Sequence, residues 1–398
     1  DHPDTLQSRN NLADGYWAAG NLGRAIPLFE ATLADRERVL GRDHPDTLQS
    51  RNNLAGGYWA AGDLGRAILL DEATLADRER VLGLDHPDTL ISRNDLAVDY
   101  WAAGDLGRAI PLLEATLADR ERVLGPDHPN TLQSRKNLAL GYRTSGDLAR
   151  AIPLFEATLA DRERVLGPDH PNTLQTRNNL AGAYRAAGDL GRAIPLFEAT
   201  LADRERVLGP DHPQTLRSRD DLARAYRLAG DLGRAIPLFE ATLADRERVL
   251  GPDHPDTLRS RNNLAGGYRA ARDLGRAIPL YEATLADRER VLGPDHPDTL
   301  TSRGDLVLSH ADDGAGEKAL PLARLNVDES GRVFGAEDLR TLMRRDTVAD
   351  VLLSVGRTRE ATELMTDLLA DCRRILGDHA LTRTVEQRLA DATGEAAE

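Results

Sequence analysis

Apolar residues recur at helical spacing throughout the chain, as residues 1–42, "DHPDTLQSRNNLADGYWAAGNLGRAIPLFEATLADRERVLGR", illustrate. One apolar stripe, in a helix that we expect to begin near Pro3, consists of Leu6, Leu12, Ala13 and Tyr16. A second stripe, after a break at Gly20, consists of Leu22, Ala25, Ile26, Phe29, Leu33 and Leu40. Gly41 ends this second helix. The pattern predicts two antiparallel amphipathic helices joined by a tight turn.

The same motif returns every 42 residues, starting again at Asp43, Asp85, Asp127, Asp169, Asp211, Asp253 and Asp295. We predict nine repeats, 1–42, 43–84, 85–126, 127–168, 169–210, 211–252, 253–294, 295–336 and 337–378, of which the last two are degenerate. Residues 379–398 are predicted to form a terminal capping helix and a polar tail. One repeat buries too little apolar surface to offset its conformational entropy, so neighbouring repeats must stack into an α-solenoid.

The recurring motif "NNLAxxYxxxGxxxxAxxLxExxLxxRExxLGxDHPxT" resembles the tetratricopeptide repeat of the kinesin-light-chain type. The resemblance covers at least seven repeats well and the ninth by spacing alone. It implies an all-α, right-handed superhelix of helix pairs. It also implies that the first helix of each pair lines a concave groove that binds extended peptides.

Composition and charge narrow the possible functions. The formal net charge of −14 disfavours a general binder of nucleic acid or of anionic membranes. The single cysteine, Cys372, rules out an intrachain disulfide, and no apolar run is long enough to predict a membrane span. We therefore expect a cytoplasmic protein. Lys136 and Lys318 are its only lysines, and this preference for arginine suggests a GC-rich bacterial genome.

The predicted groove face of the first helices varies most between repeats. Trp17 recurs as Trp59 and Trp101, and the same position then becomes Arg143, Arg185, Arg227 and Arg269. We interpret this change as a groove with an aromatic, apolar half and a cationic half. The alternative is drift at a solvated position, with tryptophan packed against the next helix.

Asparagines recur beside this position. We predict that a ladder of side-chain amides pairs with the backbone of a bound peptide, because each amide offers both donors and an acceptor. The alternative is hydrogen bonding between the helices of adjacent repeats. The ladder consists of Asn10, Asn11, Asn52, Asn53, Asn94, Asn137, Asn178, Asn179, Asn262 and Asn263.

Several other features do not predict catalysis or metal binding. The eight "DHP" histidines, His2 to His296, lie too far apart for one metal and are expected to serve helix starts. The segment "GAGEK" at 314–318 lacks the spacing of a phosphate loop and falls at a turn between helices. The alternating charges of "DRERV" predict a solvated helix face, on which we also place Cys372. No cofactor site and no enzymatic motif is predicted.

Asp71 departs from the core pattern, because it replaces Phe29 of the first repeat on the apolar stripe. A buried, unpaired carboxylate is costly. We therefore expect the second repeat to be locally loose, or Asp71 to reach solvent or an arginine.

Together these patterns predict a non-enzymatic scaffold that binds a protein or an extended peptide. We expect an acidic ligand with an apolar or aromatic end. The chain starts part-way through a repeat, which suggests the sensor or adaptor part of a longer signalling protein. The alternatives are a structural array that self-associates through its ends and, third, an RNA-binding array, which would need a basic groove along its whole length.

Overall fold

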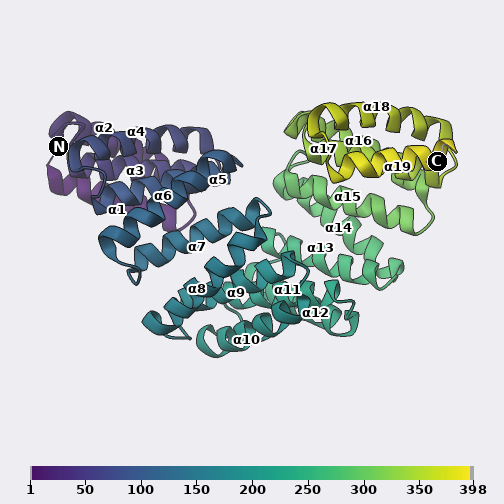
Figure 1. Cartoon of the computed structure of the whole chain (residues 1–398), viewed down its shortest axis with the longest axis horizontal. Helices are drawn as coiled ribbons and strands as arrows, with labels where there is room; N and C mark the ends of the chain where they lie inside the picture. The colour runs from purple at the N-terminus through teal and green to yellow at the C-terminus, as the bar shows by residue number, and fades with distance from the viewer. Residues whose placement is uncertain (1, 395–398) are drawn as a thin grey trace. The chain divides into compact units, whose positions relative to one another are not determined.

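The computed structural model describes residues 2–394 and consists of helices joined by short turns (Figure 1). The first helix of each repeat, called the A helix below, has 16 residues, and the second, the B helix, has 19. The A helices are α1 Pro3–Ala18, α3 Pro45–Ala60, α5 Pro87–Ala102, α7 Pro129–Thr144, α9 Pro171–Ala186, α11 Pro213–Leu228, α13 Pro255–Ala270, α15 Pro297–Asp312 and α17 Leu339–Ser354. The B helices are α2 Leu22–Leu40, α4 Leu64–Leu82, α6 Leu106–Leu124, α8 Leu148–Leu166, α10 Leu190–Leu208, α12 Leu232–Leu250, α14 Leu274–Leu292, α16 Gly316–Phe334 and α18 Thr358–Leu376. One more helix, α19, spans Ala380–Thr393.

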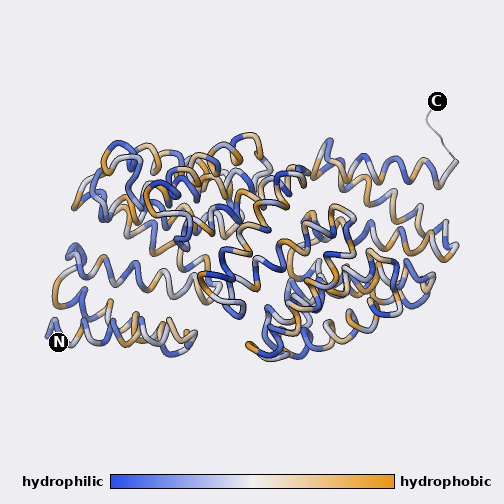
Figure 2. Tube along the Cα trace, turned by 90° about the horizontal axis from the view of Figure 1, so that it is seen from below, coloured by the Kyte–Doolittle hydropathy of each residue, from blue (hydrophilic) through white to orange (hydrophobic). Residues whose placement is uncertain are grey.

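The prediction of an all-α chain of tandem helix-turn-helix repeats is confirmed. The chain divides into two compact units, residues 1–196 and 197–398, called the N-terminal and C-terminal units below. Each helix from α1 to α8 in the N-terminal unit, and from α11 to α18 in the C-terminal unit, packs against the next helix in sequence. Hydrophobic and hydrophilic positions alternate along each helix in Figure 2, as an amphipathic pattern requires.

The recurrent histidines cap the A helices. In the second repeat His44 Nδ1 accepts a hydrogen bond of 3.2 Å from the backbone amide of Asp46. Pro45 follows the cap at the first helical position, where the missing N–H would have no partner. Among residues 2–394 no cluster of histidine, cysteine or carboxylate side chains is arranged to hold a metal ion. The histidines thus serve helix starts, as predicted.

The core consists mostly of leucine and alanine, together with phenylalanine and tyrosine, whereas no isoleucine is among its buried residues. Leu54 and Tyr58 of α3 pack with Phe29 of α2, and all three are buried. Leu12, predicted on the same stripe, is 52% exposed. The reason is its place at the start of the stack, because no described helix packs on that side of α1.

The interpretation of "DRERV" as a solvated face is wrong for its first arginine. Arg120 is buried and donates to Ser134 Oγ at 2.7 Å and to the carbonyl of Asn130 at 3.0 Å, both in the next repeat. Its other terminal nitrogen donates to the carbonyl of Leu90 at 2.9 Å. The buried members of this set are Arg36, Arg78, Arg120, Arg162, Arg204, Arg246 and Arg288. They connect the B helix of one repeat to the A helix of the next.

Cys372 occupies the same position in the ninth repeat and, contrary to expectation, is completely buried. It lies in an apolar cluster with Met365, Leu368 and Val385. Burial raises the pKa of its thiol. A neutral, enclosed thiol is a packing element and not a nucleophile.

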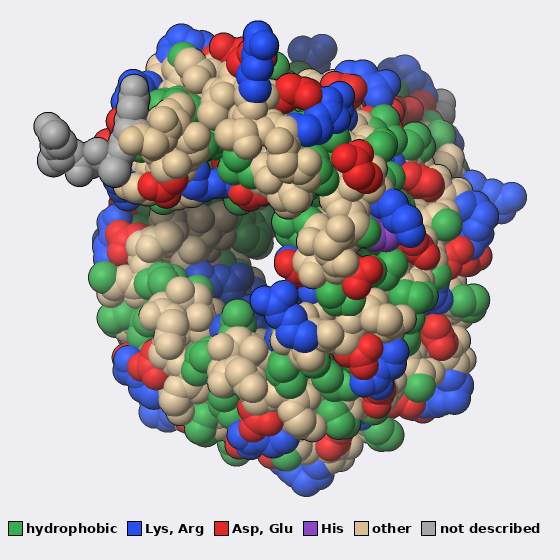
Figure 3. Space-filling model, turned by 90° about the vertical axis from the view of Figure 1, so that its right-hand side faces the viewer, with side chains coloured by type: hydrophobic (Ala, Val, Ile, Leu, Met, Phe, Trp, Pro, Cys, Tyr) green, Lys and Arg blue, Asp and Glu red, His purple; other side chains and the backbone are tan. Residues whose placement is uncertain are grey.

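The second arginine of the motif forms exposed ion pairs in most repeats. Arg122 pairs with Asp85 at 2.8 Å and with Asp119 at 2.8 Å. The face drawn in Figure 3 accordingly shows cationic and anionic side chains interspersed. No helix among residues 2–394 is both long and apolar enough to cross a bilayer.

Candidate functional site

The position that changes from tryptophan to arginine points from one A helix toward the next. Trp101 Nε1 donates a hydrogen bond of 3.0 Å to Thr144 Oγ1 of α7. Arg269 Nε donates at 2.7 Å to Asp312 of α15. Trp17 and Trp59 remain 45% and 44% exposed. The position is thus partly accessible and lies where consecutive A helices meet.

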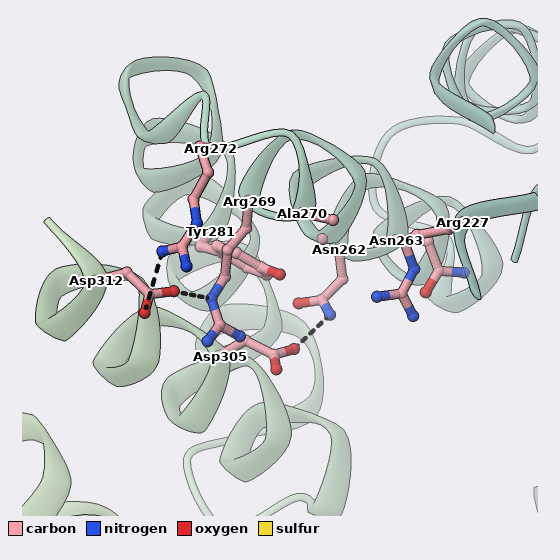
Figure 4. A pocket seen from close by; sticks show the side chains of 10 residues that line it. Arg227, Asn262, Asn263, Arg269, Ala270, Arg272, Tyr281, Asp305 and Asp312 are labelled. Carbon is pink, nitrogen blue, oxygen red and sulfur yellow. Dashed lines mark hydrogen bonds and ion pairs between the residues drawn. The ribbon is translucent and has the colours of Figure 1, made fainter. Parts of the chain in front are cut away.

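In the C-terminal unit the arginines Arg227 and Arg269 line a cavity of 420 Å³ between α11, α13 and α15. Figure 4 shows the Arg269 guanidinium between Asp312 and Asp305, and Arg272 reaching the same Asp312. Among the described residues, Arg227 makes no ion pair, and its side chain is half-buried. The other residues that line this arginine cavity are Asn262, Asn263, Gly266, Ala270 and Tyr281.

Neighbouring donors of the arginine cavity already engage part of the charge of its two aspartates. Asn262 Nδ2 donates to Asp305 at 2.8 Å, and Ser302 Oγ donates to Asn262 Oδ1 at 2.8 Å. Burial raises the pKa of Asp305, which Asn262 and the nearby arginines counteract. With three arginines facing two aspartates, the cavity retains cationic groups that an incoming acid can contact.

Two residues of the arginine cavity depart from the internal repeat in ways that the sequence reasoning missed. Arg272 stands where eight other repeats have a turn glycine, and its φ is 61°. Tyr281 stands where Phe239 lies one repeat earlier, and its hydroxyl lies 3.2 Å from the point that a Cβ of Gly266 would occupy. Comparing the repeats position by position would have found both residues.

In the N-terminal unit, Trp17 and Trp59 line a second cavity, of 270 Å³. Its other lining residues are Asn52, Gly56, Asp71, Asp95, Val98 and Asp99. The predicted aromatic half therefore contains three carboxyl groups at this place and is not simply apolar. Asp99, like Arg272 and Tyr281, was not singled out from the sequence. We call this site the tryptophan–aspartate cavity.

Asp71 neither reaches solvent nor forms an ion pair with an arginine, so two of the three expected alternatives are wrong. It is 4% exposed, and its carboxyl group faces that of Asp99, which is 5% exposed. Burial, followed by the charges of Asp99 and Asp95, raises the pKa of Asp71 far above its ordinary value. Burial also raises the pKa of Asp99. The pair thus holds a proton near neutral pH instead of an arginine.

The asparagines connect consecutive A helices, which is the second of the two interpretations of the ladder. Asn53 Nδ2 donates to Asn10 Oδ1 at 3.2 Å, and Asn137 Nδ2 donates to Asn94 Oδ1 at 3.2 Å. Asn263 Nδ2 donates at 3.0 Å to Asp220. These bonds use groups that were expected to meet a peptide backbone.

The asparagines of the ladder differ in how far their side chains are exposed to solvent. Asn10, Asn94, Asn178 and Asn179 are buried, whereas Asn52, Asn53, Asn137, Asn262 and Asn263 are half-buried and Asn11 is exposed. Because the buried amides lie between helices, we do not propose that they bind a peptide backbone. Asn52, Asn262 and Asn263 line the two cavities.

Arg143 and Arg185 lie in the N-terminal unit, and Arg227 and Arg269 lie in the C-terminal unit. Arg143 reaches toward α9, since its terminal nitrogen lies 3.2 Å from the point that a Cβ of Gly182 would occupy. Both Arg143 and Arg185 are half-buried and engaged in interactions with neighbouring groups. The structure therefore brings two of the four arginines together in one cavity.

The chain resembles other helical repeat proteins of known structure. A kinesin light chain-like protein with nearly identical TPR-like repeats from Podosopora anserina is 33% identical over 52% of this chain and 98% of its own, with a TM-score of 0.47. The apo form of RapI is 11% identical, with a TM-score of 0.54, over 98% of both chains. A Rap protein complexed with Competence and Sporulation Factor is 13% identical, with a TM-score of 0.50, over 98% of both chains.

No curated protein is significantly similar in sequence. Family models described as tetratricopeptide repeat match residues 4–78, 96–163, 137–203 and 179–248, and a second such model matches 257–298 and 341–380. The matches of the first model alone extend over more than half of the chain. The chain therefore belongs to the tetratricopeptide repeat family.

Proposed function

We propose that the protein is a non-catalytic scaffold that binds a polypeptide through the inner residues of its A helices, and that it serves as an adaptor or sensor in signalling. The fold is known for protein–protein interaction, which supports the general class. A Rap protein of this fold is complexed with Competence and Sporulation Factor, so helical repeats of this kind can hold a bound factor.

The observation that carries the proposal is the arginine cavity. Arg227 has no ion-pair partner among the described residues, and Arg269, which lines the same cavity, is paired with Asp312. Guanidinium groups bind carboxylates through two parallel hydrogen bonds. We therefore propose a ligand segment with acidic side chains at this cavity. In the N-terminal unit, the exposed rings of Trp17 and Trp59 offer a separate contact for an apolar or aromatic segment.

A pair of labelled peptides tests this proposal. One peptide carries glutamate at alternate positions, and its partner carries glutamine instead. Fluorescence anisotropy should show binding of the glutamate peptide, weakened about tenfold or more by Arg227→Ala with Arg269→Ala, because each exposed pair contributes on the order of 1 kcal/mol. Binding should also weaken as sodium chloride rises from about 0.05 M to about 0.5 M.

A matched control separates local contacts from net charge. Arg248 and Arg290 are exposed arginines of the same unit, paired with Asp211 and Asp253 outside the cavity. The double variant Arg248→Ala with Arg290→Ala removes the same two charges and should leave affinity nearly unchanged. Equal losses in both double variants, or equal binding of the two peptides, would refute recognition by the arginine cavity.

A further inference from the structure

The tryptophan–aspartate cavity arises from paired departures from the internal repeat. At most other junctions a large side chain of the B helix packs on a small residue of the next A helix. Phe29 lies 3.4 Å from the Cβ point of Gly57, and Phe239 lies 3.3 Å from that of Gly267. Between the second and third repeats the corresponding residues are Asp71 and Asp99. The loss of the ring leaves space, and the two carboxyl groups border it.

The third acid of the cavity departs from the repeat as well. Asp95 stands where Asn53 and Asn137 occur in the neighbouring repeats, and it also lines the cavity. Three carboxyl groups that arose at three separate positions thus border one space. Drift at unrelated positions gives no reason for this convergence.

The two buried acids lack donors. Among the described residues, no N–H or O–H group donates to Asp71 Oδ1 or to Asp99 Oδ2, and both atoms are fully enclosed. The hydrogen bond open to this pair is one between the two carboxyl groups, and it requires a proton on one of them. Buried acceptors without donors require an explanation, and here the two acids border a cavity that has room for a group able to supply donors.

We propose that this cavity binds the ammonium group of a lysine side chain presented by a bound polypeptide. The lysine as its source rests on the proposed function. An ammonium group offers three donors and no acceptor, which suits a ring of carboxyl oxygens. Trp17 and Trp59 border the entrance, and indole rings attract cations through their faces. The volume of 270 Å³ exceeds that of a water molecule, about 30 Å³, several times over, so the end of an alkyl chain fits.

Binding exchanges one cation for another. The proton shared by Asp71 and Asp99 leaves to solvent as the ammonium group enters, so charge in the cavity is conserved. Arg78 faces Asp71, and Arg78 and Arg120 face Asp95, but both arginines are held by hydrogen bonds to Ser92 and Ser134. The affinity for the ammonium group therefore rises with pH, because the competing proton is then bound less.

The test uses lysine acetylated at its α-nitrogen and capped as a methylamide, so that only the side-chain ammonium group is charged. The same derivative of norleucine serves as its uncharged counterpart. Tryptophan fluorescence of the full chain should respond saturably to the lysine compound and not to the norleucine compound. The affinity should increase from about pH 5 to about pH 8. Calorimetry in two buffers of different ionisation enthalpy should detect the released proton.

Two variants distinguish charge from shape. Asp71→Asn with Asp99→Asn keeps the cavity and removes the charges, and it should weaken binding at least about tenfold. Asp71→Phe with Asp99→Gly restores the packing of the other junctions and should abolish binding while the protein becomes more stable, so unfolding cannot explain the loss. Asp14 of α1 accepts a hydrogen bond of 2.9 Å from Asn10 Nδ2 and does not line the cavity, so Asp14→Asn should bind as the parent does.

Equal responses to the two compounds, or an unchanged affinity in the asparagine variant, would overturn the proposal. Either result would show that the acids form a proton-sharing pair with no ligand. Binding of the glutamate peptide at Arg227 and Arg269 provides a separate readout. A failure of the lysine site is thereby distinguishable from a failure of the proposed scaffold function.

Discussion

At the scale of single residues, near-identical repeats make each departure informative. The A-helix and B-helix motifs recur with few changes, so an unusual residue can be compared with the same position elsewhere in the chain. Arg272 and Tyr281 meet in the arginine cavity, and Asp71, Asp95 and Asp99 meet in the tryptophan–aspartate cavity. Departures that conflict with the local rule gather where ligands have room to bind.

Arg272 tests this idea through backbone strain. Its φ of 61° is a conformation that costs a residue other than glycine about 1 kcal/mol. Arg272→Gly should therefore raise the free energy of unfolding by about that amount, measured from urea denaturation followed by circular dichroism. Arg272→Ala, which removes the guanidinium and keeps the strain, should not be stabilised. A stabilisation of equal size in both variants would place the cost in charge repulsion.

Asp71 and Asp99 predict a dependence of stability on pH. Their pKa values in the folded chain are raised, so the folded state binds more protons than the unfolded state. The contribution of this pair to stability is then largest below the unfolded carboxyl pKa of about 4 and is lost as pH rises through the folded-state values. In the variant Asp71→Phe with Asp99→Gly this loss of stability with rising pH should be absent. At pH 7 this variant should gain about 2 kcal/mol from burial of the ring.

The single variant Asp71→Phe provides the control, since the ring would meet Asp99 where most other junctions have glycine or alanine. It should be less stable than the double variant at every pH. Urea titrations between about pH 4 and about pH 8 measure both effects. An unchanged pH dependence in the double variant would show that these acids do not titrate as described.

At the scale of helices, most B helices carry a buried arginine and an exposed ion-paired arginine two residues apart. We expect the buried arginine to contribute more to stability than the exposed one. Arg120 satisfies three acceptors in three different places, whereas Arg122 pairs with acids on the surface two residues further along α6. Removing a buried guanidinium leaves its former hydrogen-bond acceptors buried and unsatisfied. An exposed pair is screened by solvent.

Arg120→Ala should lower the free energy of unfolding by about 3 kcal/mol, because Ser134 and two backbone carbonyls lose their donor. Arg122→Ala, the matched control on the same helix, should lower it by less than about 1 kcal/mol. Hydrogen exchange should show the loss of protection in α6 and α7. Similar effects of the two substitutions would mean that the buried network does not hold the repeat junction together.

At the scale of the whole molecule, stability depends on contacts between neighbours. Helices α1 to α9 pack in order of sequence, and no repeat can bury its apolar stripe alone. The hydrogen bonds of the buried arginines and asparagines also join adjacent repeats. We therefore expect the protein to remain folded when a whole repeat is removed, but not when the alternation of A and B helices is broken.

Deletion of residues 127–168, one full repeat, should leave a helical protein with a modestly lower melting temperature, because the third repeat can then stack on the fifth. Deletion of residues 127–147 alone removes α7 and its turn and leaves two B helices in succession. This second variant should lose helicity and aggregate. Circular dichroism and size-exclusion chromatography measure both, and equal behaviour of the two deletions would contradict the nearest-neighbour account.

The sequence by itself determined the helices, their order and the repeat. The spacing of Leu6 and Ala13, the turn glycine Gly20 and the capping His44 act through local backbone geometry, which a pattern of letters can report. The tertiary structure decided which charged residues are buried. Arg120 and Cys372 look like members of a solvated face until the next helix covers them. It also decided that Asp71 meets Asp99 and that Arg227 and Arg269 line one cavity, because both arrangements depend on how one repeat stacks on another.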